Sequence, residues 1–331
     1  MKRLILFIVV LLVPVVAPAQ RRGGGPPQPP APKEVAATAI PGVVAAGAKI
    51  ELIASGVTSP EGSLALPDGS GIIFCERPAH IARIDASGKM STFVENGNAS
   101  NGLAWDSKGR LIAVQRPRGA EKVGVLYPAG SVATLVDNFE GKPFNGLNDL
   151  VVSTKDGIYF TDTEGVYYLA PGAPGSQVKR VIQDIDNPNG VQLSPDEKTL
   201  YANDKDGEYL LAFDVQPDGS LKNRRNFGKY KSVKIADSKD PRIAEDNGAD
   251  GLAIDGAGRV YVATNLGVEV FSPRGEHLGV IPMGIWGTGP VDGKPANLTF
   301  AGPDKKTLYT VGSGVVYRVE MLAQGFKGRG K

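Results

Sequence analysis

The sequence is poor in the residues that bind transition metals and cross-link exported folds. It has one cysteine and two histidines among 331 residues. A single cysteine excludes an intramolecular disulfide, and its place in the apolar run Ile72-Ile73-Phe74-Cys75 predicts a buried, inert thiol. Zinc and copper sites built from His and Cys are disfavoured, because the chain offers only His80, His277 and Cys75.

An excess of charge of one sign is also missing. There are 37 basic and 35 acidic residues, which gives a formal net charge of +2. No cluster of Lys and Arg is interleaved with aromatic residues, so nucleic acid is not an expected partner. A Gly-x-Ser-x-Gly motif is absent, which removes support for hydrolysis by a Ser-His-Asp triad.

Long apolar runs are limited to the start of the chain. Two basic residues precede an apolar run over residues 4–16, and Ala17-Pro18-Ala19 follows it. This pattern predicts a secretory signal peptide over residues 1–19, with an uncleaved anchor as the alternative. The mature protein is then expected to be exported, either periplasmic or secreted, and free of the membrane.

Glycine, by contrast, is abundant, and with Asp, Asn and Pro it separates many short apolar runs. Short apolar runs separated by turn-forming residues predict an all-β fold. Six segments share one pattern, a short strand, a polar turn and a second strand, with starts spaced 40 to 61 residues apart. A weaker pair of strands follows most of them. Four antiparallel strands per repeat and six repeats predict a six-bladed β-propeller.

The last repeat lacks a fourth strand after residues 315–319. Residues 49–53 are expected to supply it, so that the N-terminal strand pairs with the last blade and closes the ring. The predicted organisation is therefore a Pro/Gly-rich disordered linker over residues 20–47, a propeller over 48–322 and a basic tail over 323–331. We expect a monomer.

One position recurs just ahead of the first strand of every repeat. It is occupied by Glu61, Asn101, Asn148, Asn189, Asp250 and Ala296. First strands line the axis of a propeller, so these side chains should converge in the channel. Two carboxylates with several amide oxygens suit Ca²⁺, with other divalent cations such as Zn²⁺, Mn²⁺ or Mg²⁺ left open. The alternative is that the Asn-Gly and Asp-Gly pairs are turns.

The loops that follow the second strands should lie at the same end of the channel. They bring Arg77, Arg116, Asp162, Asp204 and Asn265 to its rim. Two long connections, residues 231–249 and 284–295, should lie on this face as well. The second contains Trp286, which we expect to help shape a substrate pocket.

At these residues the sequence resembles the SMP-30/gluconolactonase/luciferin-regenerating-enzyme family. The motifs are Phe144-Asn145-Gly146-Leu147-Asn148-Asp149, Pro188-Asn189-Gly190, Asp250-Gly251-Leu252-Ala253-Ile254-Asp255 and Phe300-Ala301-Gly302-Pro303-Asp304. The resemblance implies a six-bladed propeller with a divalent ion, usually Ca²⁺, in the channel. It places the metal ligands on Glu61, Asn148, Asn189 and Asp250.

The same resemblance implies hydrolysis of small lactones. The metal would polarise the ring carbonyl, Asp250 would activate water, and Asn101 and Arg116 would contact the substrate. The alternative for Arg116 is a solvated charge at the rim. Asp149 and Asp204 are the alternative bases. Hydrolysis of phosphotriesters or other esters at the same metal, and a non-catalytic ligand-binding propeller, are the alternative functions.

The chain departs from the family pattern at three places. Ser63 stands where the family has Pro after Glu-Gly, and Gly146-Leu147 replaces a frequent Ser-Pro. Both departures predict adjustments of the backbone. Gln115-Arg116 replaces Glu-His, which changes the charge at the channel mouth and leaves the identity of the substrate open.

Overall fold

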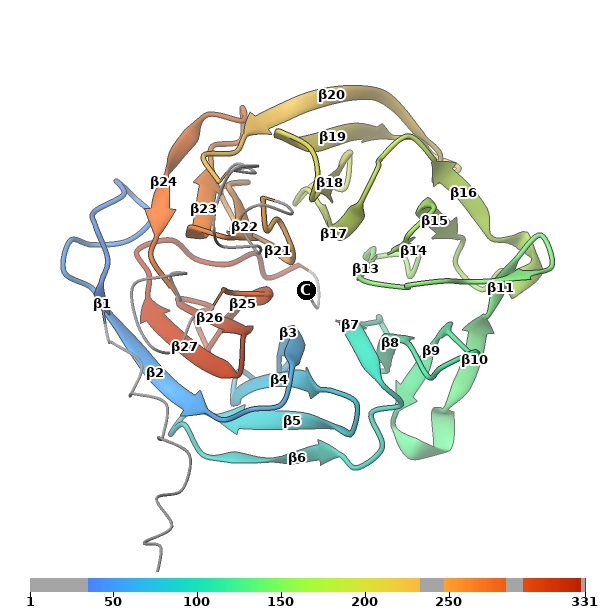
Figure 1. Cartoon of the computed structure of the whole chain (residues 1–331), viewed down its shortest axis with the longest axis horizontal. Helices are drawn as coiled ribbons and strands as arrows, with labels where there is room; N and C mark the ends of the chain where they lie inside the picture. The colour runs from blue at the N-terminus through green and yellow to red at the C-terminus, as the bar shows by residue number, and fades with distance from the viewer. Residues whose placement is uncertain (1–34, 233–246, 284–293, 329–330) are drawn as a thin grey trace, which may run out of the picture.

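The computed structural model describes residues 35–232, 247–283, 294–328 and 331. Six small antiparallel sheets surround a central axis, which confirms the six-bladed β-propeller (Figure 1). In the described ranges, the helical segments are two short 3-10 turns, Ala129–Ser131 and Gly175–Gln177. None of the helices in these ranges has the length and apolar character that a membrane span requires. The predicted signal peptide, residues 1–19, lies outside the described residues.

The strands of each blade follow one another outward from the axis. Blade 1 contains β3 (Pro60–Ala65), β4 (Gly71–Glu76), β5 (His80–Asp85) and β6 (Met90–Val94). Blade 2 contains β7 (Ser100–Trp105), β8 (Leu111–Gln115), β9 (Lys122–Tyr127) and β10 (Ala133–Val136). Blade 3 contains β13 (Leu150–Val152), β14 (Ile158–Asp162), β15 (Gly165–Leu169) and β16 (Lys179–Ile182). A small hairpin of β11 (Asn138–Phe139) and β12 (Lys142–Pro143) precedes blade 3.

The second half of the ring repeats this arrangement. Blade 4 contains β17 (Pro188–Leu193), β18 (Thr199–Asp204), β19 (Tyr209–Val215) and β20 (Leu221–Lys229). Blade 5 contains β21 (Leu252–Ile254), β22 (Val260–Thr264), β23 (Gly267–Phe271) and β24 (His277–Ile281). Blade 6 contains β25 (Asn297–Ala301), β26 (Thr307–Gly312), β27 (Val315–Glu320) and β2 (Lys49–Ser55), with β1 (Val35–Ala36) at its outer edge.

Ring closure occurs as predicted. Strand β2 pairs antiparallel with β27, with Leu52 opposite Tyr317, so the two ends of the chain share blade 6. The hydrophobic core consists of six clusters, each between two neighbouring blades. Because the blades pack face to face, their middle strands are buried on both sides, as in β4 and β22.

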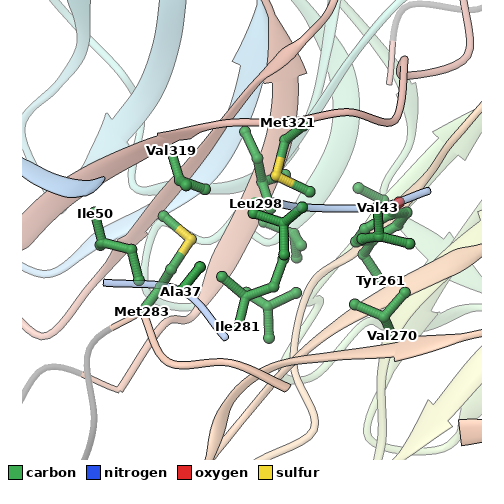
Figure 2. Packing of buried hydrophobic residues seen from close by; sticks show 14 of the residues in the cluster. Ala37, Val43, Ile50, Tyr261, Val270, Ile281, Met283, Leu298, Val319 and Met321 are labelled. Atoms are coloured by element: carbon green, nitrogen blue, oxygen red, sulfur yellow. The ribbon is translucent and has the colours of Figure 1, made fainter. Parts of the chain in front are cut away.

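The prediction of a disordered linker is wrong for residues 35–47. Strand β1 pairs with β2, and Ala37, Ile40, Val43 and Val44 are buried in the cluster between blades 5 and 6. Figure 2 shows Ala37 and Val43 among residues of both blades. These small apolar side chains have no strand-like alternation of their own, and they are stabilised by a surface that the blades provide. Residues 20–34 lie outside the described part of the chain.

The predicted boundary at residue 322 is also too early. Ala323 is buried, Gly256 N donates to Gln324 O (2.8 Å), and Phe326 N donates to Ile254 O (3.1 Å). The C-terminus lies at the centre of the ring (Figure 1). Its Gly and Lys residues predict a solvated tail, whereas its backbone hydrogen bonds hold the segment against blade 5.

A candidate metal and catalytic site in the central channel

The innermost strands of the six blades bring the recurring polar residues to the channel. Glu61, Asn101 and Asn189 are each the second residue of an inner strand, while Asn148 and Asp250 lie two residues before β13 and β21. The repeat pattern predicts that all five lie ahead of the first strand. The prediction is wrong for Glu61, Asn101 and Asn189, which lie within it. In those three blades the pairing register shifts next to the polar residue, an irregularity that can redirect a side chain.

The turn alternative does not hold for Asn101-Gly102 and Asn189-Gly190, because both pairs lie within strands. The glycines instead allow neighbouring inner strands to approach. A Cβ at Gly190 would lie 2.2 Å from the carbonyl oxygen of Asp250, and one at Gly62 would lie 1.8 Å from that of Asn101. The motif therefore couples each polar position to the equivalent position of the next blade.

Two of the four predicted metal ligands present oxygens without a partner. Glu61 Oε2 and Asn189 Oδ1 are buried and accept no hydrogen bond from the described residues. Leaving a buried acceptor unsatisfied costs about 1–3 kcal/mol, and more for a charged group. Such oxygens on two facing blades are the feature expected of a site that binds a cation.

Burial raises the pKa of Glu61 to about 8, and the negative charge of Asp250 adds to this effect. The cations Arg77 and Lys294 oppose the shift, and Asp149 contributes to it. The carboxylates of blades 1 and 5 are therefore close enough to influence each other electrostatically.

The donor set fits a hard cation. In the described ranges no three His, Cys, Asp or Glu side chains form a cluster that could hold a metal by themselves. The predicted set has two carboxylates, from Glu61 and Asp250, and two amide oxygens, from Asn148 and Asn189. An all-oxygen set of mixed charge is typical of Ca²⁺, which binds six to eight oxygens and accepts water among them.

Asn101 bridges two blades at this end of the channel. Its Nδ2 donates to Asn148 O (3.0 Å) and to Asn148 Oδ1 (3.2 Å). Its Oδ1 accepts a hydrogen bond of 2.6 Å from Arg77 Nη1. Arg77 Nη2 also lies 3.8 Å from Glu61 Oε1, so Arg77 connects Asn101 with a predicted ligand. Sequence analysis places Arg77 at the rim but assigns it no role.

Asp250 has contacts through both its backbone and its side chain. Its backbone carbonyl accepts a hydrogen bond from Asn203 Nδ2, and Asn203 Oδ1 in turn accepts one from the hydroxyl of Tyr230 (2.5 Å). The ammonium group of Lys294 lies 3.4 Å from Asp250 Oδ2. Sequence analysis missed Lys294, although the small Ala296 two residues later marks the one repeat without a side-chain oxygen.

The two alternative bases have other partners in the described residues. Asp149 is buried, forms an ion pair with Lys331 Nζ (2.5 Å) and accepts a hydrogen bond from Val191 N (3.2 Å). Asp204 accepts a hydrogen bond of 3.1 Å from Asp206 N at the end of β18. Neither contact involves a predicted metal ligand, and of the carboxylates that act on Glu61 the larger effect comes from Asp250.

The departures from the family pattern have structural counterparts. Ser63 Oγ donates to Asn297 Oδ1 (3.2 Å) and so links blade 1 to blade 6, which proline could not do. Leu147 N donates to Glu121 Oε2 (2.8 Å), and a proline at 147 would have no N–H to donate. The second bond attaches the segment before Asn148 to the loop after β8.

Arg116 begins that loop, at the end of β8. Gln115 pairs with Ser100 of β7, and Arg116 N donates to Ala99 O (3.2 Å). The backbone of Arg116 therefore lies beside the start of β7, which carries Asn101, and the residue is partly exposed. Trp286, the third predicted substrate contact, lies outside the described residues.

Cys75 is buried as predicted, its Sγ donates to Asn101 O (3.2 Å), and burial raises its pKa.

A cavity of about 690 Å³ opens at the other end of the channel. It is lined by turns that join the first and second strands, including Asp68, Ser107 and Thr154, together with Lys327 and Lys331. The chain direction places these turns on the face opposite Glu61 and Asp250. This cavity is therefore separate from the candidate site.

Comparison with known proteins agrees with the fold and the motifs. The chain is 28% identical over 316 residues to a gluconolactonase of Zymomonas mobilis, covering 83% of this chain and 82% of that protein. It is 30% identical over 200 residues to lactonase drp35 of Staphylococcus haemolyticus, covering 54% and 57% of the two chains.

Solved structures show the same fold. A gluconolactonase of Xanthomonas campestris superposes with a TM-score of 0.70 at 24% identity, covering 88% of this chain and 98% of that one. The calcium-binding protein regucalcin of Agrobacterium tumefaciens superposes with a TM-score of 0.61 at 15% identity, covering 83% and 92%. Residues 119–313 match the model of the SMP-30/gluconolactonase/LRE-like region, and the chain belongs to this family.

Proposed function

We propose that this protein is a Ca²⁺-dependent lactonase whose site is the channel end formed by Glu61, Asn148, Asn189 and Asp250. The observation that carries the proposal is the pair of buried, unpartnered oxygens, Glu61 Oε2 and Asn189 Oδ1. Lactone hydrolysis is the activity in the names of the gluconolactonase and lactonase relatives. Their likeness over most of the ring supports the same reaction class here.

The four ligand residues would hold the ion through oxygen atoms alone. When bound, Ca²⁺ would supply Lewis acidity toward the ring carbonyl of the lactone. Asn101 restrains Asn148 through its hydrogen bond to the amide oxygen, and Arg77 restrains Asn101. These contacts keep the channel groups in place before substrate enters, which lowers the cost of ordering the site.

Asp250 is the proposed general base. Its carboxylate takes a proton from water as the water oxygen bonds to the carbonyl carbon, and the proton then passes to the ring oxygen as the ring C–O bond breaks. The product is a hydroxy acid. The hydrogen bond from Asn203 holds the backbone of Asp250, and the ammonium of Lys294 lies beside its carboxylate.

Metal removal tests the proposal. Protein stripped with a chelator should lose lactone hydrolysis, and added Ca²⁺ should restore it with the same midpoint that calorimetry gives for Ca²⁺ binding. Full activity after stripping contradicts the metal assignment. Ca²⁺ binding without hydrolysis of any lactone in a broad panel contradicts the enzyme assignment and favours a ligand-binding propeller. Faster turnover of phosphotriesters than of lactones would favour the other ester chemistry.

A further inference from the structure

Charged residues surround the end of the channel that carries Glu61 and Asp250. Three cations, Lys294, Arg77 and Arg116, belong to blades 6, 1 and 2, which are neighbours in the ring. Blades 3 and 4 instead place Asp162 and Asp204 at the ends of their second strands. Both aspartates are buried, and burial raises the pKa of Asp162 to about 6.

Two of the three cations already have carboxylate partners. Lys294 lies 3.4 Å from Asp250, and Arg77 lies 3.8 Å from Glu61 while it donates to Asn101. In the part of the chain that the structure describes, the Arg116 guanidinium has no ion pair. Glu121, the acid in the same loop, is directed to Leu147 N at 2.8 Å. Arg116 is therefore the cation available to a ligand.

We infer that this site selects lactones that carry a free carboxylate, and that Arg116 binds this group. The inference rests on the proposed lactonase function and specifies its substrate class. An arginine presents a planar fork of donors that matches a carboxylate. A substrate would then enter with its acid toward blade 2, where Arg116 begins its loop. The backbone of Arg116 lies beside the start of β7, the strand that carries Asn101, so this contact would form at the channel end that holds the proposed site.

The test uses two lactones that differ only at the sixth carbon. D-glucono-1,4-lactone has a hydroxymethyl group there, and D-glucaro-1,4-lactone has a carboxylate. With Ca²⁺ saturating, we expect the unmodified protein to favour the acidic lactone in kcat/KM. Arg116→Gln should lower the ratio of acidic to neutral kcat/KM by about 10-fold, the lower end for a hydrogen bond to a charged group at a partly exposed site. High salt should lower the ratio in the unmodified protein.

Arg118→Gln is the matched control, because it removes the same charge from an exposed side chain two residues away. It should leave the ratio unchanged. The inference is overturned if the neutral lactone is preferred, or if Arg116→Gln and Arg118→Gln have the same effect, while the lactonase function stands in both cases. If neither lactone is hydrolysed, the function fails for this pair, and calorimetric binding decides the inference alone: equal affinity for the two lactones overturns it.

Discussion

Asp250 has two roles in the proposed mechanism, metal ligand and base, and its surroundings allow variants to separate them. Its carboxylate lies beside Lys294, whereas its backbone carbonyl is bound by Asn203. A change of the side chain therefore leaves the main-chain anchor in place. Glu61 is the natural comparison, because it supplies the other carboxylate but has no role as a base.

Asp250→Asn should lower turnover at saturating Ca²⁺ by about 10² to 10⁴, the range for losing a general base, because an amide oxygen can still bind the metal but cannot accept the proton. Glu61→Gln removes an equal charge and should weaken Ca²⁺ binding while turnover at saturation changes less. Steady-state kinetics and calorimetry of both variants check this. An equal loss of turnover in the two variants would show that Asp250 is a ligand alone.

At the scale of elements, one hydrogen bond joins the loop after β8 to the segment before β13. Glu121 accepts from Leu147 N, and Leu147 is completely buried. The segment continues into Asn148, whose N donates to Thr161 O (2.9 Å). The loop that starts with Arg116 therefore also supports a predicted metal ligand.

Glu121→Ala should lower the free energy of unfolding by about 1–3 kcal/mol, because it leaves a buried N–H without an acceptor. It should also weaken Ca²⁺ binding, since Asn148 loses a restraint. Denaturant unfolding and calorimetry give the two quantities. Glu121→Gln keeps an acceptor oxygen and should retain most of both, and Glu95→Ala removes an exposed carboxylate elsewhere. If the Ala and Gln variants at 121 behave alike, the hydrogen bond does not position Asn148.

On the scale of the whole molecule, the N-terminal segment contributes to the ring in two ways. Strand β2 supplies the missing strand of blade 6, and residues 35–47 cover the junction of blades 5 and 6 (Figure 2). Stability of the ring should then depend on residues that lie before the first repeat.

Ile40→Ala should lower the free energy of unfolding by about 2–5 kcal/mol, as for an isoleucine in a core, because Ile40 is 3% exposed. Val132→Ala is the control, since Val132 is 58% exposed and should change stability by less than about 0.5 kcal/mol. Denaturant titration of both variants measures the difference. An effect of Ile40→Ala as small as that of the control would mean that residues 35–47 do not stabilise the propeller.

Local patterns in the sequence determined the blades and their inner positions. Each blade repeats short apolar runs and turn residues that stabilise hairpins, so six blades and the strand at residues 49–53 could be predicted. The same repeat singled out six equivalent positions, because equivalent positions of a ring converge on its axis, and the family resemblance then placed the metal ligands on Glu61, Asn148, Asn189 and Asp250. The order of apolar, turn and polar residues within each repeat is therefore enough to predict the blades and their inner positions.

Contacts between blades and across the channel were decided by the tertiary structure alone. Lys294 beside Asp250, Arg77 on Asn101 and Lys331 on Asp149 join residues far apart in the chain, and nothing in their neighbours marks the partner. The burial of Ile40 depends likewise on a surface made by two other blades. Charges and small apolar side chains find such partners only once the ring has closed, because closure brings blade 6 against blade 1 and the chain ends to the core.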